Sequence, residues 1–319
     1  MTRPTPPRAV WAGLVGETLG VIVSSVPPPL TAWRGLLPPL ALLLVWDVVV
    51  TLAYVRGWLG FGEITIQYTL YGTAVALFLG FMVNAAYARW WEARTLWGTI
   101  TNHSRNLARE SVTLLDTAAA EARPMLVTEV VRAQAAYVHV LRTSLRGQEP
   151  PEELTRYTTD EVAARVLEAT NKPNAVLNEI GTLLTEARRR GMVDTITRVQ
   201  LETTLTTLAD AQGGLERIKN TPLPVQYRFL PSFFARTFCV ILPFAMAQDL
   251  RWLTPVGSGL VGMMFLLAVQ VGRDLADPFR DEIHDVPMTA ITRTIEIDLL
   301  ETIGERSPDR VGPRHEVLW

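Results

Sequence analysis

Residues 67–109 read QYTLYGTAVALFLGFMVNAAYARWWEARTLWGTITNHSRNLAR. The first half of this stretch is almost uncharged and is long enough to cross a bilayer as a helix. The second half becomes charged at Arg89 and contains no proline, so the helical pattern continues past the apolar part. The stretch therefore predicts one long helix that leaves the membrane at its C-terminal end.

Two stripes of residues spaced four apart run along the apolar half of this helix. The first consists of small side chains, at Gly72, Ala76 and Gly80. The second, one position further round, consists of uncharged side chains, at Thr73, Leu77 and Phe81. A helix that packs through its small stripe and turns the second stripe toward a central axis would line a narrow hydrophobic constriction. Ordinary helix packing is the alternative interpretation of the same spacing.

The composition indicates an integral membrane protein. Of the 319 residues, 48% are hydrophobic and only 19% are charged, and the apolar residues are concentrated in a few runs. The net charge of −2 and the absence of a basic stripe argue against nucleic acid as a partner. Cys239 is the single cysteine, so neither an internal disulfide nor a cysteine-based metal site can form.

The sequence does not favour an enzyme, and it implies no cofactor. It contains no glycine-rich phosphate loop and no G-x-S-x-G motif around a nucleophile. Four histidines are scattered without the spacing of metal ligands: His103, His139, His284 and His315.

Four membrane spans are predicted, at residues 36–55, within 67–101, at 229–247 and at 252–271. The last two form a helical hairpin, and Ser258 with Gly262 provides a small-residue contact. Arginine and lysine cluster before the first and third spans and after the second and fourth, which predicts that both termini lie in the cytoplasm. We therefore expect a multi-pass protein of the cell membrane.

The N-terminal part has two further features, a segment before the first span and a carboxylate within that span. Residues 9–24 are expected to form a short amphipathic or interfacial segment, and no cleaved signal peptide is recognised. Asp47 lies in the middle of the first span, where a carboxylate is costly and should face protein or water. It is expected to be either a buried hydrogen-bonding group or part of a permeation path.

Between the second and third spans the chain is polar and helical in pattern. Apolar residues recur at helical spacing, at Val127, Val130, Val131, Ala135, Val138 and Leu141. Further helices are expected at residues 152–167, 175–190, 195–218 and 289–303. The predicted organisation is 1–101 with two spans, 102–228 as a helical cytosolic region, 229–272 with two spans, and 273–319 as a C-terminal helix and tail. The fold class is that of an all-α membrane protein.

The sequence NAAYARWWEARTLWGTITNHSRNLARE, at residues 84–110, resembles the signature of the bestrophin family. LPFAMAQDLRWLTPVGSGLVGMMF, at 242–265, is similar to the family's hairpin between its last two spans. DLADPFRDEIHDVPMTAITRTIEIDLLE, at 274–301, is similar to its C-terminal stretch around Asp-Pro-Phe. With NTPLPVQY at 220–227, the resemblance covers about residues 30–301 as one integrated domain.

This resemblance implies a homopentamer around one central pore, with four membrane helices and a large cytosolic helical part per subunit. The family's membrane neck carries three rings of apolar residues, which correspond here to Thr73, Leu77 and Phe81. Thr73 departs from the bulkier residue that is usual at the outer ring, so this neck is expected to be wetter there. A second, cytosolic aperture corresponds to Ile196, and Asp194 is implied as a vestibule residue.

Aromatic and basic residues at the exit of the long helix are expected to have structural roles. Trp90, Trp91 and Trp97 are expected to be interfacial or core aromatics. Arg89 and Arg94 are expected to hold the helix exit through ion pairs or helix ends.

Eukaryotic bestrophins bind calcium through an acidic run after Asp-Pro-Phe, and here that run is interrupted. The carboxylates Asp281, Glu282 and Asp285 remain as weak calcium candidates, but Arg280, Ile283 and His284 lie among them. Because calcium takes six or more oxygen ligands, no metal is expected, as in the calcium-independent bacterial branch.

The expected function is the passive flux of small monovalent ions, with a preference for cations such as sodium, as in bacterial members. A chloride channel, as in eukaryotic members, is the alternative, because an uncharged neck does not select the sign of the ion. A secondary transporter is the alternative from another class, although no internal repeat is found. A membrane-anchored scaffold that conducts nothing is a further alternative. The expected partners are other copies of the chain, the lipid bilayer and the permeating ions.

Overall fold

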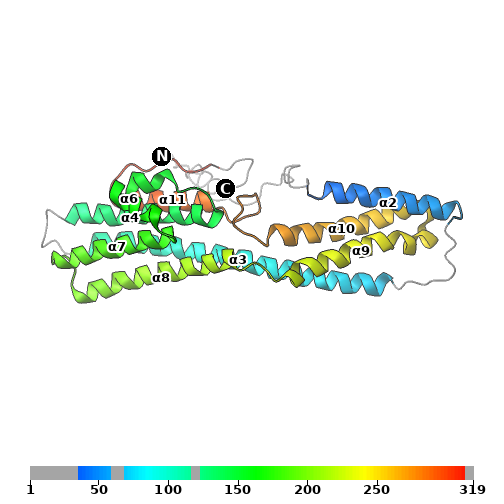
Figure 1. Cartoon of the computed structure of the whole chain (residues 1–319), viewed down its shortest axis with the longest axis horizontal. Helices are drawn as coiled ribbons and strands as arrows, with labels where there is room; N and C mark the ends of the chain where they lie inside the picture. The colour runs from blue at the N-terminus through cyan, green and yellow to red at the C-terminus, as the bar shows by residue number, and fades with distance from the viewer. Residues whose placement is uncertain (1–34, 59–67, 116–122, 313–319) are drawn as a thin grey trace, which may run out of the picture. The chain divides into compact units, whose positions relative to one another are not determined.

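The structure, a computed structural model, describes residues 35–58, 68–115 and 123–312, and every regular element within these ranges is helical (Figure 1). The predicted amphipathic segment at residues 9–24 lies outside the described residues. In chain order the elements are α2 Leu37–Val55, α3 Tyr68–Leu114, α4 Arg123–Arg146, α5 Glu152–Tyr157, α6 Asp160–Glu168, α7 Lys172–Arg189, α8 Thr195–Asn220, α9 Val225–Leu250, the 3₁₀ turn Arg251–Leu253, α10 Thr254–Asp274 and α11 Met288–Thr302.

Three stretches are long and apolar enough to cross a membrane: Leu37–Val55, Tyr68–Leu114 and Val225–Leu275. The third contains two helices, α9 and α10, which pack side by side as the predicted hairpin (Figure 1). Four apolar helices thus form one bundle, in which α10 contacts α2, α3 and α9. Its core, here called the span core, consists of Val75, Leu79, Met82, Ala235, Phe238, Leu242 and Val269.

Small residues let α2 and α10 approach each other closely. A Cβ atom at Gly262 would lie 2.3 Å from Cδ2 of Leu43, and one at Gly259 would lie 2.6 Å from Cδ2 of Leu44. No side chain fits in that space without a shift of the neighbouring leucine. The predicted small-residue contact at Gly262 is therefore confirmed, because α2 occupies the space that a side chain would need.

Helix α3 is one uninterrupted helix of 47 residues, as predicted. At a rise of 1.5 Å per residue, it is about 70 Å long, roughly twice the thickness of a bilayer's hydrocarbon core. Its first part contributes Val75, Leu79 and Met82 to the span core. Its second part buries Trp97, Ile100 and Leu107 among α4, α8 and α11. One helix thus joins the apolar bundle to the polar helical region.

The polar region has a large core of its own, centred on α4. The six apolar positions whose spacing predicted this helix are all buried, with exposed fractions between 0% and 7%. One boundary was wrong, because residues 152–167 form two helices, α5 and α6, instead of one. The break falls at Thr158 and Thr159, where the Thr159 hydroxyl accepts a hydrogen bond from the N–H of Val162 and caps α6. Competition of threonine hydroxyls for backbone groups favours such a break.

Candidate functional site

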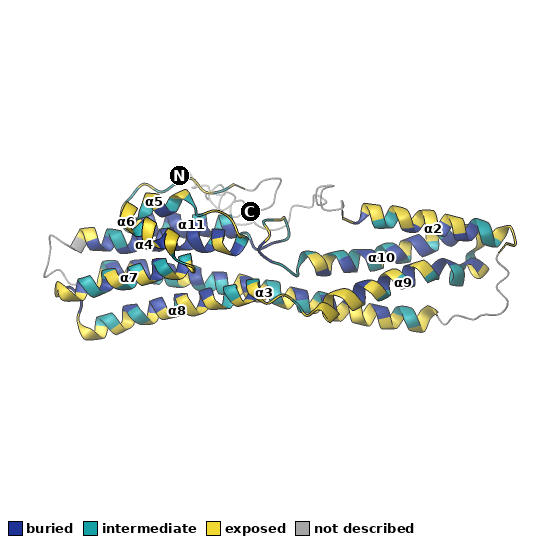
Figure 2. Cartoon of the chain, in the orientation of Figure 1, coloured by how far each residue is buried: buried dark blue, intermediate teal, exposed yellow. Residues whose placement is uncertain are grey.

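The apolar half of α3 has one packed face and one open face. Val75, Leu79 and Met82 are buried, whereas the side chains of Leu77 and Phe81 are 58% and 54% exposed. Thr73 is also exposed. Figure 2 shows this alternation as dark and yellow bands along α3. Within the protomer, the stripe Thr73, Leu77 and Phe81, here called the neck stripe, therefore lies on the open face.

The neck stripe presents an uncharged and largely apolar surface. Successive members are four residues apart, or about 6 Å along the helix axis. The hydroxyl of Thr73 donates to the carbonyl oxygen of Thr69 over 2.8 Å, so its proton is used within the helix. The stripe therefore carries no formal charge.

Within the protomer, the small stripe packs against another helix at only one position. A Cβ atom at Gly72 would lie 3.0 Å from Cζ of Phe238, so α9 packs closely there. Ala76 and Gly80 are exposed, and a Cβ atom at Gly80 would have no neighbour within 4 Å in the described protomer. The bulky residues Leu79 and Met82 fill the contact with α9 and α10 instead, because helix packing here follows burial of large apolar groups.

The residue implied as the cytosolic aperture, Ile196, lies in the first turn of α8 and is 81% exposed. Asp194 is the N-cap of the same helix. The backbone N–H of Thr197 donates to Oδ1 of Asp194 over 2.6 Å, and this hydrogen bond lowers the pKa of the carboxyl below its ordinary value. The structure thus gives Asp194 a local role in starting the helix, while its role in a vestibule stays a prediction.

Asp47 is fully buried between the helices of the span bundle. Its Oδ1 accepts a hydrogen bond of 3.0 Å from the hydroxyl of Ser258 on α10. Within the described residues, Oδ2 has no hydrogen-bond partner. Because α2 packs on α10 and α9, this arrangement favours a buried hydrogen-bonding group over a group in the permeation path.

Two of the three weak calcium candidates, Asp281 and Asp285, have partners within the protein. Nη2 of Arg146 lies 2.6 Å from Oδ1 of Asp281, so a cationic side chain already neutralises this carboxylate. Asp285 is buried and accepts a hydrogen bond of 2.9 Å from the N–H of Glu282. Burial raises the pKa of Asp285 to about 6. Among the described residues, no group of three or more potential ligands is arranged to hold a metal ion.

The exit of α3 from the apolar bundle is fixed by hydrogen bonds to other segments. Nε1 of Trp90 donates to the carbonyl oxygen of His284 over 3.0 Å. The guanidinium of Arg89 donates to the carbonyl oxygens of Ile218 and Thr221, at the C-terminal end of α8. The predicted role of Arg89 at a helix end is confirmed, and it matches the preference of cations for that end.

Sequence reasoning missed a buried charged cluster in the polar region. Glu296 of α11 is fully buried, and its carboxylate lies 3.0 Å from Nε2 of His139 and 2.7 Å from Nη1 of Arg293. Tyr157 donates a hydrogen bond to the same carboxylate. The pKa of Tyr157 is raised to about 12, mainly by burial and to a smaller extent by this hydrogen bond. No motif marks these residues, because they come from three helices far apart in the sequence.

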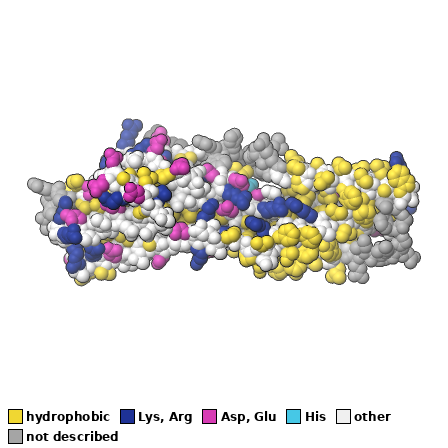
Figure 3. Space-filling model, in the orientation of Figure 1, with side chains coloured by type: hydrophobic (Ala, Val, Ile, Leu, Met, Phe, Trp, Pro, Cys, Tyr) yellow, Lys and Arg dark blue, Asp and Glu magenta, His cyan; other side chains and the backbone are white. Residues whose placement is uncertain are grey.

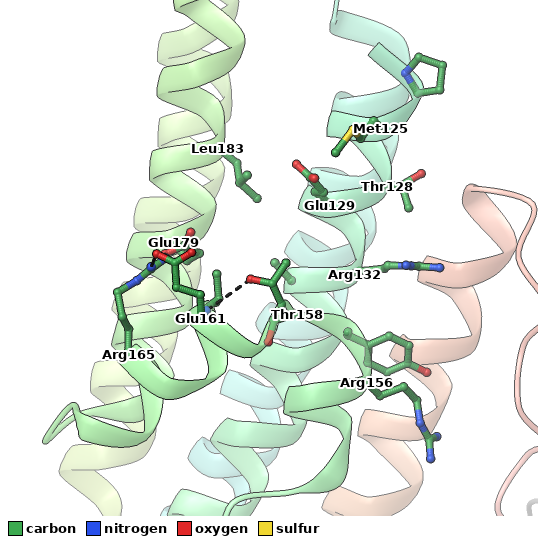
Figure 4. Close-up of a pocket in the computed structure, with 15 residues that line it drawn as sticks. Met125, Thr128, Glu129, Arg132, Arg156, Thr158, Glu161, Arg165, Glu179 and Leu183 are labelled. Atoms are coloured by element: carbon green, nitrogen blue, oxygen red, sulfur yellow. Dashed lines mark hydrogen bonds and ion pairs between the residues drawn. The ribbon is translucent and has the colours of Figure 1, made fainter. Parts of the chain in front are cut away.

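A cavity of about 730 Å³ lies between α4, α6 and α7 (Figure 4). Three of its charged side chains pair with one another, since Arg165 lies 2.9 Å from Glu161 and 3.0 Å from Glu179. None of the predicted site residues lines it. We assign it no role.

The bundle of apolar helices, continued by one helix into a polar helical region, defines an α-helical multi-pass membrane protein. Comparison with known proteins gives the family. Residues 22–301 match the family described as bacterial/fungal bestrophin protein. The chain belongs to this family of bestrophins, whose members are ion channels and not enzymes.

Named relatives and a solved structure agree with this assignment. The voltage-dependent anion channel-forming protein YneE of Escherichia coli K12 is 38% identical over 253 residues, covering 79% of this chain and 81% of that protein. A protein of the same name from Ralstonia nicotianae, RSc3414, is 33% identical over 285 residues, covering 87% and 92%. The crystal structure of a bacterial bestrophin homologue from Klebsiella pneumoniae matches with a TM-score of 0.79 at 30% identity, covering 85% of this chain and 99% of that one.

Proposed function

We propose that the chain assembles as a homopentamer in the cell membrane and conducts small monovalent ions passively along its central axis. The observation that carries the proposal is the open face of α3, where the neck stripe projects away from the span core. Large apolar side chains on an open face need a partner subunit, lipid or a pore to face. A ring of five α3 helices would bring the neck stripes together around one conduit.

In this proposal Phe81 and Leu77 form the narrow part of the neck. An ion would shed part of its hydration there, because an uncharged ring offers no compensating charge. A hydrophobic ring of this kind can also close by drying, without a moving plug. The hydroxyl oxygen of Thr73 keeps lone pairs free for water, which supports a wetter outer ring.

Ile196 is proposed as a second ring along the same axis. An isoleucine that is 81% exposed at the start of a helix contributes nothing to the protomer's own core. Its exposure supports a function at a surface that only the assembly creates. Asp194 lies two residues earlier, with its carboxylate held by the helix N-terminus.

The proposed selectivity is for anions. The relatives in Escherichia coli and Ralstonia carry the name voltage-dependent anion channel-forming protein, which favours anions over the cations expected from the sequence. The uncharged neck stripe is compatible with either sign. We propose further that both termini face the cytoplasm, as the distribution of basic residues around the spans indicates.

Recording from single proteins in planar bilayers tests the proposed function. A channel gives stepwise currents that grow with voltage. A secondary transporter gives saturable exchange without such steps, and a scaffold gives no flux. Reversal potentials in a sodium chloride gradient, with chloride and then sodium replaced by a large impermeant ion, determine the sign of the permeating ion. The proposal expects the reversal potential to follow chloride.

A further inference from the structure

A basic cavity of about 540 Å³ lies where α9 begins and α10 ends, beside the middle of α3. Six basic side chains line it: Arg89, Lys219, Arg228, Arg236, Arg273 and Arg280. Asp277 is the one carboxylate among the described residues that line it. Figure 3 shows basic side chains gathered on this face, where the hydrophobic surface of the spans begins.

Most of this positive charge is not neutralised within the described part of the chain. Arg280 pairs with Asp277, with Nε 3.2 Å from Oδ2. Four of the other basic groups form no ion pair with any described carboxylate: Lys219, Arg228, Arg236 and Arg273. Like charges held together repel one another, so an anion bound among them would relieve that repulsion.

The beginning of α9 adds to the positive potential. This helix of 26 residues starts at Val225, which lines the cavity, and its N-cap residue Pro224 provides no side-chain hydrogen bond. The first N–H groups of a helix carry a partial positive charge and bind anions, phosphates in particular. The basic side chains and the helix end therefore favour the same kind of ligand.

An apolar groove adjoins the basic cavity. It has a volume of about 610 Å³ and is lined by α2, α9 and α10, through Gly35, Pro39, Leu42, Leu43, Trp46, Cys239, Val240 and Leu266. Arg236 lines both the groove and the basic cavity, so the two meet at this residue. Phe229 and Phe233 add exposed rings at the wall of the basic cavity, with exposed fractions of 59% and 49%.

We propose that the basic cavity and the apolar groove together bind an anionic phospholipid, with its phosphate among Arg228, Arg236 and Arg273 and an acyl chain along the groove. A free phosphate ion would occupy only the basic cavity and would leave the apolar groove empty. The groove lies within the spans and meets the cavity at Arg236, so a ligand that fills both needs an apolar chain on the same molecule as its phosphate. Basic pockets between membrane helices bind acidic headgroups in this way.

The test measures lipid retention by the purified full-length protein in its assembled state. Native mass spectrometry follows binding of phosphatidylglycerol and of phosphatidylcholine with the same acyl chains. Wild-type protein is expected to retain phosphatidylglycerol several-fold better than phosphatidylcholine. The double variant Arg228→Gln/Arg273→Gln is expected to lose this preference, whereas Arg228→Lys/Arg273→Lys keeps it.

Controls separate the site from general charge and from free anions. Arg56→Gln removes a cation at the opposite end of α2 and is expected to change nothing. Excess sn-glycerol 3-phosphate is expected not to displace the lipid. Since the spectrum also gives the mass of the assembly, lipid loss is read only from assembled protein. If the double variant does not assemble, Arg228→Gln alone, at an exposed side chain, provides the same comparison. The proposal would be overturned if the assembled glutamine variant retained phosphatidylglycerol as well as the wild type does. It would also be overturned if sn-glycerol 3-phosphate displaced the lipid from the wild type.

Discussion

The hydroxyl of Ser258 on α10 donates a hydrogen bond of 3.0 Å to Oδ1 of Asp47 on α2, and both residues are fully buried. A polar contact inside an apolar bundle ties two spans together at a defined register. It also gives Asp47 a structural reason to be present, separate from transport.

Asp47→Asn is therefore expected to leave single-channel conductance and reversal potential unchanged. Asparagine keeps an oxygen that can accept the hydrogen bond from Ser258, and it has nearly the same shape. Ser258→Ala leaves the carboxylate without this donor and is expected to lower stability by about 1–3 kcal/mol, measured by thermal unfolding in detergent. Loss of all flux in an assembled Asp47→Asn protein would instead indicate a transporter that uses the carboxylate.

The close approach of α2 and α10 leads to a prediction about packing. Gly262→Leu is expected to lower stability by about 1–3 kcal/mol, because its side chain would enter the space of Leu43. Gly98→Ala on α3 is the control for adding a side chain at an open helical glycine, since a Cβ atom there meets nothing within 4 Å in the described protomer. That change is expected to be neutral or to stabilise the helix by up to about 1 kcal/mol. Equal melting temperatures for the two variants would contradict the close packing of α2 against α10 at Gly262.

The buried carboxylate of Glu296 is expected to make stability depend on pH. Burial is the largest single effect and raises its pKa. The hydrogen bonds from His139 and Tyr157, together with the nearby charge of Arg293, outweigh burial, so the pKa lies below the ordinary value of 4.5. A lowered pKa means that the ionised carboxylate stabilises the fold at neutral pH, and that this contribution disappears as the pH falls below 4.5.

Glu296→Gln should thus lower the free energy of unfolding by about 3 kcal/mol at pH 7, since it leaves His139 and Arg293 without their buried anion. The difference from wild type should shrink in unfolding measurements below pH 4.5. Glu161→Gln, at a carboxylate with 86% of its side chain exposed, serves as the control and should have little effect at either pH. If the stability difference between wild type and Glu296→Gln grew toward acidic pH, the pKa of Glu296 would be raised and not lowered.

Ile196→Ala tests the second ring. Because the side chain is 81% exposed in the protomer, its truncation is expected to leave folding and assembly intact and to change conductance or selectivity. Met125→Ala, which removes a 66% exposed apolar side chain from α4, should change neither. Size-exclusion chromatography with bilayer recording separates the outcomes, and a dissociated Ile196→Ala assembly would point to subunit packing instead.

The helices were predictable from the sequence because apolar runs and helical periodicity are local signals. The long α3, the hairpin of α9 and α10, and the buried positions of α4 all follow from such patterns. The single break between α5 and α6 was missed, since threonine capping competes with an otherwise continuous helical pattern.

The faces of α3 were only half predictable. The spacing of Thr73, Leu77 and Phe81 identifies one stripe, and the structure leaves that stripe open. Which neighbouring stripe packs inward depends on the shapes of α9 and α10, and Leu79 and Met82 are buried there in place of Ala76 and Gly80. The Glu296 cluster and the basic cavity could not be foreseen, because each joins side chains from segments far apart in the chain.

Accessibility of a cysteine at position 81 during current flow tests the central claim most directly. The chain is suited to this measurement, because its single cysteine, Cys239, is buried. Phe81→Cys is compared with Leu79→Cys, because the native Leu79 side chain lies in the span core and is only 3% exposed. With a charged thiol reagent applied to open channels, we predict rapid and irreversible block of Phe81→Cys and no block of Leu79→Cys. Unchanged current through the conducting Phe81→Cys channel would contradict the account.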